Sequence, residues 1–327
     1  MSVALKVEKD LSGKRDYINR LIQNEPKTGV LFADFVAVTA LRKSNRMSEM
    51  YVKNYNTLIL HLNAFSKQYN ANIYTNSVGE EFLEDFVTYL EGNDLRQNYI
   101  SNLLSLVKSM AAKAAKYGYA VDPSYDDVSI KLENTFSIFL SMNKITRIYY
   151  YMGLTKKQEK IRDLFVVGCL TALRFSDYST LTTDNFTKDF IIKIVKKTKT
   201  RITIPIHDYV REILNKYNGN LYSGVSIQYF NRSIKKICKL IGFNEDVKFN
   251  YTKGGKLIYE TKQAWELISS HTARRSAATN MYQTARMGTY EIMALTGHTT
   301  EKSFFRYIKT SSEDKAKQIA GDSYFRG

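Results

Sequence analysis

The sequence predicts a mainly α-helical protein with a small β-sheet, an α+β fold divided into two domains. Three observations predict it. A length of 327 residues suits about two domains. Apolar side chains recur at helical spacing through residues 31–118. Residues 186–206 instead alternate between apolar and polar and are rich in β-branched side chains, which favours strands in the second half of the chain.

The first half is expected to fold as a compact helical bundle over residues 31–118. Its helical spacing is carried by three sets of residues: Leu58, Leu62 and Phe65; Phe82, Phe86 and Tyr89; and Tyr99, Leu103, Leu106 and Met110. Gly92, Asn93 and Asp94 mark a break between two of the helices. Basic residues punctuate the bundle, namely Arg42, Lys43, Arg46, Lys53, Arg96, Lys108, Lys113 and Lys116. Any single lysine among them most often only keeps an outer face in water.

Segments with a weaker pattern flank this bundle. Residues 1–30 are polar, so we expect an N-terminal extension that is partly mobile. Residues 119–136 contain Pro123, show little periodicity and are expected to form a linker. The second domain is then expected to span residues 137–310, followed by a polar C-terminal tail at 311–327.

The second domain is expected to combine helices with strands. Its predicted elements are a helix at 155–173, strands within 186–206, a hairpin at 247–260 around Gly254 and Gly255, and helices at 264–282 and 290–295. The helix at 155–173 changes from amphipathic to fully apolar along its length, which indicates a buried helix.

The chain carries a large positive charge. Lys and Arg number 48 against 32 Asp and Glu, which gives a net charge of +16 and a pI near 9.5. This surplus exceeds what solubility requires, and nucleic acid is the commonest polyanionic partner of such a protein.

Cysteine and histidine usage argues against a disulfide framework and a metal centre. The two cysteines, Cys169 and Cys238, have no motif spacing, and the chain has only four histidines. The first ten residues carry charges where a signal peptide needs an apolar core, and no apolar run reaches the ~20 residues of a membrane span. The protein is therefore expected to be cytoplasmic.

The last third of the chain holds the residues that most suggest chemistry. His271 and Arg274 are three residues apart and share one face of a helix, and His298 precedes Tyr307 by nine residues. An arginine can clamp a phosphate, and a histidine can transfer a proton near neutral pH. A tyrosine hydroxyl can form a covalent intermediate. Together these residues favour phosphoryl transfer to a tyrosine.

These residues resemble the catalytic signature of the tyrosine recombinases, the phage integrase family. The matching boxes are His271-Thr-Ala-Arg274, Leu295-Thr-Gly-His298 and Tyr307. Upstream, Arg174 in Ala-Leu-Arg-Phe-Ser-Asp177 resembles the family's first arginine box, and Lys197 lies where a β-hairpin carries the catalytic lysine. The boxes occur in family order, and the resemblance covers roughly residues 31–310. The amino-acid sequences of residues 271–280 and 295–304 are most similar to those of integrases of Bacteroidetes mobile elements.

The resemblance also implies an architecture and partners. It implies a C-shaped DNA clamp made of a helical core-binding (SAM-like) DNA-binding domain and a tyrosine-recombinase catalytic domain. The substrate would be double-stranded DNA with specific recombination sites, bound by a homotetramer that is a monomer or weak oligomer when free. A DNA-bending accessory protein is a further candidate partner. No cofactor, metal or membrane is implied, and the location would be cytoplasmic and nucleoid-associated.

By this resemblance, Arg174 and Arg274 would clamp the scissile phosphate, and Asp177 would hold the Arg174 guanidinium. Tyr307 would be the nucleophile. Two nearby tyrosines compete with it, Tyr282 and Tyr290. For Arg174 and Asp177, which are three residues apart, an exposed ion pair is the simpler alternative.

The resemblance assigns proton transfer and further phosphate contacts to three more residues. Lys197 would be the general acid for the leaving 5′ oxygen. Its neighbours Lys193, Lys196 and Lys199 could take that role, with Lys199 the strongest competitor. His271 would help accept the tyrosine proton, and His298 would hydrogen-bond a non-bridging oxygen. An isolated histidine in either place would more often be an ordinary, partly buried side chain.

The implied function is a site-specific DNA recombinase that cleaves and rejoins strands through a 3′-phosphotyrosine, integrating or excising a mobile element. An Xer-like resolvase and a DNA invertase are alternatives. A type IB topoisomerase-like relaxer and a catalytically silent DNA-binding protein are weaker ones. Residues 1–30 are short for an arm-type DNA-binding domain, and the tail would dock in a neighbouring protomer if it follows the family.

Overall fold

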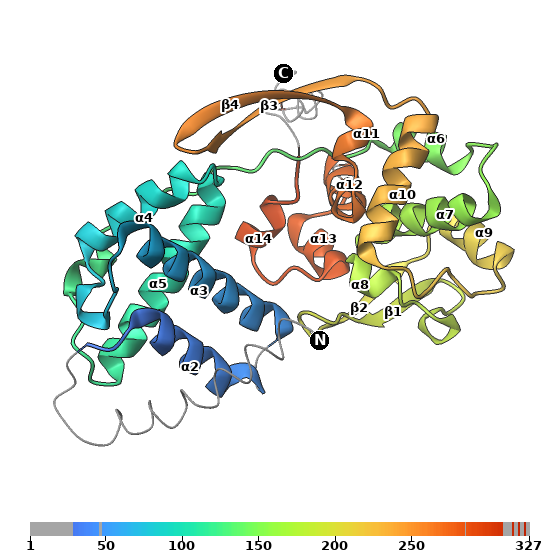
Figure 1. Cartoon of the computed structure of the whole chain (residues 1–327). Helices are drawn as coiled ribbons and strands as arrows, with labels where there is room; N and C mark the ends of the chain where they lie inside the picture. Colours follow the sequence, from blue (N-terminus) through green and yellow to red (C-terminus); the bar gives the residue numbers. More distant parts are fainter. Residues whose placement is uncertain are drawn as a thin grey trace. The chain divides into compact units, whose positions relative to one another are not determined.

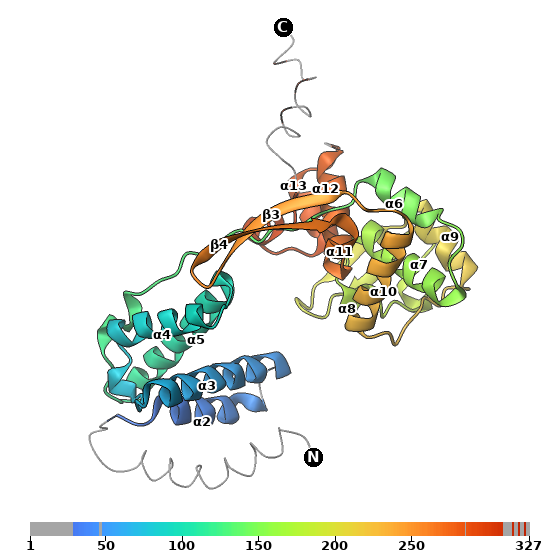
Figure 2. The same cartoon turned by 45° about the horizontal axis from the view of Figure 1, so that its top comes forward.

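The computed structural model describes residues 29–45, 48–284 and 286–309, together with residues 316, 320 and 324. The chain divides into two compact units, one comprising Met1–Thr135 and Asn250–Tyr259, and the other Phe136–Phe249 and Glu260–Gly327 (Figure 1, Figure 2). The expected N-terminal extension and C-terminal tail lie almost wholly outside the described residues. No described helix is long and apolar enough to cross a membrane.

The first unit is a helical bundle, as the sequence predicts. Its helices are α2 (Phe32–Ser44), α3 (Glu49–Tyr69), α4 (Glu80–Gly92) and α5 (Gln97–Lys116), with short 3-10 turns at Thr75–Ser77 and Pro123–Asp126. The core contains most of the residues whose spacing predicted helices, among them Leu58, Leu62, Phe86 and Leu103. Tyr99 differs from that expectation because it is exposed, and its hydroxyl lies 3.2 Å from the ring of His61.

Local backbone geometry explains where these helices end. Asn70, which follows α3, adopts a left-handed conformation with φ 48°, a geometry that asparagine tolerates better than most residues. The predicted break after Gly92 is confirmed, since α4 ends there and Asp94 has φ 60°. The chain then turns into α5.

The residues expected to form a linker are bonded to α5. Side chains of that helix donate hydrogen bonds to backbone carbonyls of the segment: Gln97 to Lys131 at 2.6 Å, Asn98 to Glu133 at 2.9 Å and Ser101 to Ile130 at 3.1 Å. These bonds satisfy carbonyl groups that no helix or strand would pair. Residues 130–133 therefore belong to the packed part of the first unit.

A long hairpin is formed by β3 (Asp246–Lys253) and β4 (Lys256–Gln263) around the predicted turn. Gly254 and Gly255 both have positive φ, 57° and 68°, which explains why glycine occupies both positions. The Gly254 N–H donates to the carbonyl of Leu95 at 3.0 Å. Residues 250–259 at the hairpin tip accordingly belong to the first unit.

The second unit is mainly helical around a buried central helix. Its helices are α6 (Met142–Tyr149), α7 (Lys156–Thr171), α8 (Phe175–Tyr178), α9 (Asp208–Lys216), α10 (Ile227–Leu240), α11 (Ala264–Leu267), α12 (Ser270–Gln283), α13 (Thr289–Thr296) and α14 (Glu301–Phe305), with a 3-10 turn at Thr183–Asn185. Helix α7 packs against α6, α9, α10 and α12 (Figure 1). Its consecutive residues Leu164 to Val167 are all buried, as expected of a helix surrounded on every side.

The β-structure consists of two separate hairpins in the described part of the chain. Strands β1 (Phe190–Ile194) and β2 (Arg201–Pro205) pair antiparallel, with Phe190 opposite Pro205 and Ile194 opposite Arg201. Alternate side chains of β2, Ile202 and Ile204, enter the core of the second unit. The turn between β1 and β2 is therefore anchored through β2 to this core.

Two features place the start of α12. The sequence suggested one helix over 264–282, but the chain breaks after α11, where the Ser269 N–H donates to the Thr272 hydroxyl at 3.0 Å. This bond caps α12 and puts His271 in its first turn. At Gly168 of α7, an added Cβ would lie 2.8 Å from the Tyr178 ring and 3.2 Å from Ala273, so glycine permits α12 to approach closely.

Candidate catalytic site

The six side chains predicted to carry chemistry lie in the second unit, each near a helix end or a turn. They are Arg174 at the start of α8, Lys197 between β1 and β2, His271 and Arg274 in the first turns of α12, His298 after α13 and Tyr307 after α14. Helix ends carry backbone groups with no partner in the helix, so several ends together can hold polar side chains in place.

Arg274 is the centre of this cluster and is 1% exposed. Its Nη1 donates to the carbonyl of Ala172, and its Nη2 donates to the carbonyl of Thr296 at 2.8 Å and to the His298 ring at 3.0 Å. Ala172 has φ 55°, so this left-handed residue after α7 directs its carbonyl to the guanidinium. The buried Nε has no hydrogen-bond partner among the described residues.

Arg174 brings a second positive charge to the same place. It is half-buried, and its buried Nη1 also lacks a partner within the described part of the chain. Burial, and then the charge of Arg174, lowers the pKa of Arg274 to about 10. Two neighbouring guanidinium groups with unpaired N–H donors form a site that suits an anion.

His298 is enclosed between Arg274 and the residues that follow α13. It is 8% exposed, and its Nδ1 lies 2.7 Å from the Thr296 hydroxyl. Burial, followed by the charges of Arg274 and Arg174, lowers the pKa of His298 to about 3. The ring is therefore neutral at pH 7 in the DNA-free protein.

Tyr307 packs its ring against both of these residues. The ring centroid lies 5.1 Å from Cζ of Arg274 and 4.9 Å from the His298 ring. The backbone around it is tied to α12, since the Thr279 hydroxyl donates to the Tyr307 carbonyl at 3.2 Å and accepts the Lys309 N–H at 3.1 Å. The tyrosine is thus held by the same helix that carries Arg274.

The competing tyrosines occupy other positions. Tyr290 is 73% exposed, and a hydrogen bond to Glu301 raises its pKa. Tyr282 packs against the rings of Phe304 and Phe305. Of the three, Tyr307 is the one whose ring lies over the Arg274 guanidinium.

His271 lies within the electrostatic influence of both arginines and of Lys197. Desolvation of the ring lowers the pKa of His271 first, followed by Arg275, Arg274, Arg174 and Lys197. By surface area the residue is exposed, so the desolvation of its ring is partial. Of the four lysines considered for general acid, Lys197 is the one whose charge acts on His271. Lys193 instead donates to the Thr180 carbonyl at 2.9 Å.

Asp177 takes a different partner from the one expected. Its Oδ1 accepts the backbone N–H of Lys196 at 2.9 Å, and its Oδ2 has no hydrogen-bond partner among the described residues. The buried carboxylate therefore ties the base of the β1–β2 turn to α8, rather than bonding the Arg174 guanidinium.

Two buried threonines that the sequence did not single out, Thr279 and Thr296, bond the backbone at Tyr307 and the His298 ring. Both occur inside or beside the matched boxes, five residues after Arg274 and two before His298. For Thr296, which follows the apolar Ile292 and Met293 by one helical turn, the available signal was a hydroxyl on a buried face, since a buried hydroxyl needs a partner.

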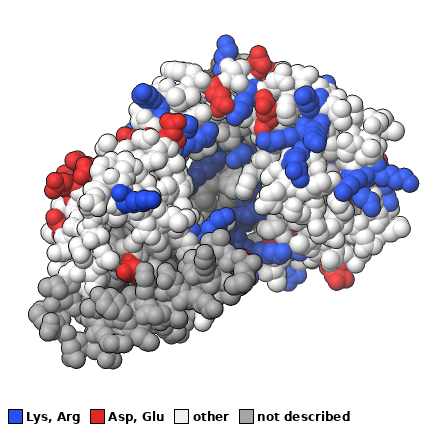
Figure 3. Space-filling model, in the orientation of Figure 1, with Lys and Arg blue, Asp and Glu red and all other residues white. Residues whose placement is uncertain are grey.

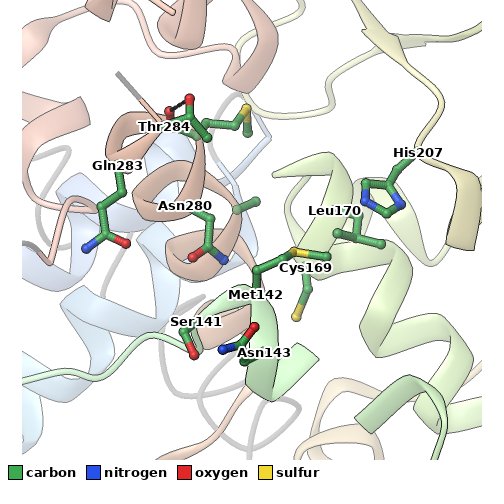
Figure 4. A pocket seen from close by; sticks show the side chains of 11 residues that line it. Ser141, Met142, Asn143, Cys169, Leu170, His207, Asn280, Gln283 and Thr284 are labelled. Carbon is green, nitrogen blue, oxygen red and sulfur yellow. Dashed lines mark hydrogen bonds between the residues drawn. The ribbon is translucent and has the colours of Figure 1, made fainter. Parts of the chain in front are cut away.

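A separate cavity of about 450 Å³ lies along the second half of α12 (Figure 4). Asn280 and Thr284 of α12, Met142 of α6, Cys169 of α7 and His207 line it with other side chains. None of the six predicted residues belongs to its lining.

The surface charge of the second unit and the placement of possible metal ligands indicate which kind of ligand this unit suits. Lys and Arg side chains are spread over the visible face of the second unit (Figure 3). Across the described residues, no group of three or more His, Cys, Asp or Glu side chains is arranged to hold a metal ion. The Lys and Arg side chains are therefore the groups on this surface that suit an anionic ligand.

Comparison with protein families identifies both halves of the chain. Residues 31–133 match the model of the phage integrase SAM-like domain, and residues 139–314 match the model of the phage integrase family. No curated protein matches the chain in sequence.

Solved structures share the fold at low sequence identity. The integrase of the transposon Tn1549, in complex with a circular intermediate DNA, is 13% identical with a TM-score of 0.64, covering 88% of this chain and 98% of that one. A lambda integrase tetramer bound to a Holliday junction is 13% identical with a TM-score of 0.63, covering 83% and 78%. The XerH site-specific recombinase on a palindromic difH substrate is 16% identical with a TM-score of 0.59, covering 89% of each chain.

Proposed function

Because the chain belongs to the phage integrase family, we propose that Tyr307 attacks a DNA backbone phosphate and that the chain thereby cuts and rejoins DNA at specific sites. The protein is a tyrosine-type site-specific recombinase. The observation that carries the assignment of the nucleophile is the contact of the Tyr307 ring with both Arg274 and His298. A phosphate placed between the two arginines would lie within reach of that hydroxyl.

The two arginines act on the charge of the transition state. Negative charge grows on the non-bridging oxygens as the phosphorus becomes pentavalent. The Arg274 Nε and the Arg174 Nη1, which lack partners among the described residues, are the donors left for those oxygens. Since Arg274 is already held by two carbonyls, little reorganisation is needed when charge develops.

Proton transfer falls to His271 and Lys197. As the bond from the Tyr307 oxygen to phosphorus forms, the phenol proton passes to His271, whose lowered pKa keeps it neutral and able to accept. The bond from phosphorus to the 5′ oxygen breaks, and Lys197 gives its proton to that oxygen. The 3′-phosphotyrosine conserves the bond energy, so a 5′-hydroxyl from a partner strand reverses the steps and joins a new strand.

The proposal extends to the biological task, the assembly and the partners. Similarity to the Tn1549 integrase fold and the wording of residues 271–280 and 295–304 support integration or excision of a mobile element of the Bacteroidetes type. A homotetramer on two DNA duplexes is supported by the lambda integrase tetramer, and the SAM-like match supports DNA binding by the first unit. A DNA-bending accessory protein and a nucleoid location would follow from such a substrate.

The test is a covalent trapping experiment. Nicked duplexes tiled across the DNA that flanks the chain's own gene are incubated with the protein in EDTA, and SDS-resistant adducts are measured. Wild type and the control Tyr290→Phe should form an adduct, and Tyr307→Phe should form none. An adduct that persists in Tyr307→Phe would remove Tyr307 as nucleophile. Relaxation of supercoils at any sequence would favour the topoisomerase-like alternative.

A further inference from the structure

A buried chain of hydrogen bonds leads away from Arg274. The Arg274 Nη2 donates to His298 Nε2 at 3.0 Å, and His298 Nδ1 lies 2.7 Å from the Thr296 hydroxyl. That hydroxyl lies 3.3 Å from the carbonyl of Met293, one turn back in α13. Thr296 is fully buried, so water cannot substitute for either partner.

The direction of these bonds follows from the groups involved. A guanidinium has N–H donors and no acceptor, so His298 Nε2 must present its lone pair to Arg274. A neutral imidazole then carries its proton on Nδ1, and this N–H donates to the Thr296 oxygen. The Thr296 hydroxyl keeps its own proton for the Met293 carbonyl. Every member of the chain thus has a partner in one consistent direction.

The burial of His298 also favours the neutral imidazole with its proton on Nδ1. An imidazolium would point an N–H at the guanidinium and add a positive charge beside Arg274 and Arg174. Burial, and then the charges of Arg274 and Arg174, lower the pKa of His298. With the proton on Nε2 instead, two donors would face each other across 3.0 Å.

We propose that Thr296 is a positioning residue that keeps His298 in its Nδ1–H form, so that the Nε2 lone pair orients the Arg274 guanidinium. The proposal rests on the function proposed above, in which Arg274 binds the scissile phosphate. Two Nη2–H and one Nη1–H of Arg274 are used by Ala172, Thr296 and His298, and the Nε–H, which has no partner among the described residues, is left for a phosphate. In the DNA-free protein His298 therefore acts on Arg274.

The test combines a spectroscopic signature with cleavage rates on the full chain. Imidazole nitrogens are labelled with ¹⁵N, and the His298 signals are assigned by their loss in His298→Gln. Wild type should show a protonated Nδ1 and an unprotonated Nε2. Thr296→Val, which keeps the shape but removes the hydroxyl, should lose the single Nδ1–H form. Its cleavage should slow by about 3- to 10-fold, the effect of one buried hydrogen bond.

Two further variants separate positioning from folding. Thr296→Ser keeps a hydroxyl and should restore both the Nδ1–H signal and the rate. Thr284→Val removes a bond of the same type on an exposed face, since the Thr284 hydroxyl also donates to a carbonyl three residues earlier, at 2.8 Å, but with no histidine attached. It should leave both signal and rate unchanged.

The outcomes distinguish this proposal from the one on which it rests. A proton on Nε2 in wild type, or an unchanged signal and rate in Thr296→Val, overturns the role of Thr296. If wild type forms no Tyr307-dependent adduct, the recombinase mechanism fails, while the ¹⁵N signals still decide the form of His298.

Discussion

Arg274 and Lys197 belong to one candidate site, but the chain holds them in opposite ways. Arg274 is 1% exposed and is bonded to two carbonyls and a histidine from two segments, one after α7 and one at the end of α13. Lys197 is exposed on the turn between β1 and β2. That turn is tied at its base by the bond from the Lys196 N–H to Asp177.

The difference matches the two kinds of work that the site would do. A clamp for developing negative charge gains most from donors that are fixed before the reaction. A general acid must deliver a proton to a leaving oxygen, and it needs reach more than burial. Substitutions on the Arg274 side should therefore affect both stability and cleavage, whereas substitutions in the turn should affect cleavage without changing stability.

The largest effect is expected for Arg274→Lys. An ammonium keeps the charge but cannot reproduce the planar donor geometry, so cleavage should fall by about 1000-fold. The buried carbonyls of Ala172 and Thr296 would also lose their donors, at a cost of about 1–3 kcal/mol each. Adduct formation and urea denaturation would measure both effects. The half-buried Arg174 is the matched control, since Arg174→Lys should slow cleavage with a smaller loss of stability.

Lys197→Ala should lower cleavage by about 100-fold and leave the melting temperature unchanged, because an exposed side chain is removed. A substrate with sulfur in place of the 5′ bridging oxygen should restore most of the rate, since a thiolate leaves without a general acid. Lys199→Ala is the control and should cleave both substrates as wild type does. If Lys199→Ala shows the defect and the rescue instead, the general acid lies two residues later.

The sequence was sufficient to indicate which side chains gather at this site, because arginine, histidine and tyrosine at these spacings belong to matched boxes. It could not indicate how Arg274 is held. Its main partners are backbone carbonyls, and any residue type could supply them. The left-handed turn at Ala172 that directs one of these carbonyls has no signal in an alanine.

In the fold, too, the sequence indicated the buried side chains but not the individual hydrogen bonds. Periodic apolar residues predicted the bundle of the first unit and the buried helix α7, because burial imposes a repeat on the sequence. The break between α11 and α12 was missed, since the capping bond of Ser269 and Thr272 lies within a helix-like pattern. Asp177 was expected to bond the Arg174 side chain, but it bonds a backbone N–H that sequence spacing cannot locate.

Thr279→Val tests whether Tyr307, the proposed nucleophile, is held as rigidly as Arg274. This change removes the two hydrogen bonds that hold the backbone at Tyr307 and Lys309. Cleavage should slow by about 10-fold while the dissociation constant for DNA stays the same, because Thr279 is fully buried and cannot touch DNA. Thr279→Ser should recover the rate. Weaker DNA binding with an unchanged cleavage rate would contradict this role.

The smallest expected effect is a change in the pH dependence of stability, and it comes from the buried His298. Burial and the two arginines lower the pKa of His298 to about 3, whereas an unfolded histidine titrates near 6.5. Between these values the unfolded chain binds a proton that the folded chain does not, so stability falls as pH drops below about 6.5. His61, His207 and His271 act with the same sign, since their pKa values are also lowered.

His298→Gln should therefore reduce, by about 2–4 °C, the loss in melting temperature between pH 7.5 and pH 5.0 without abolishing it. An unchanged pH dependence in that variant would mean that His298 accepts a proton in the folded protein, against the bond it receives from Arg274.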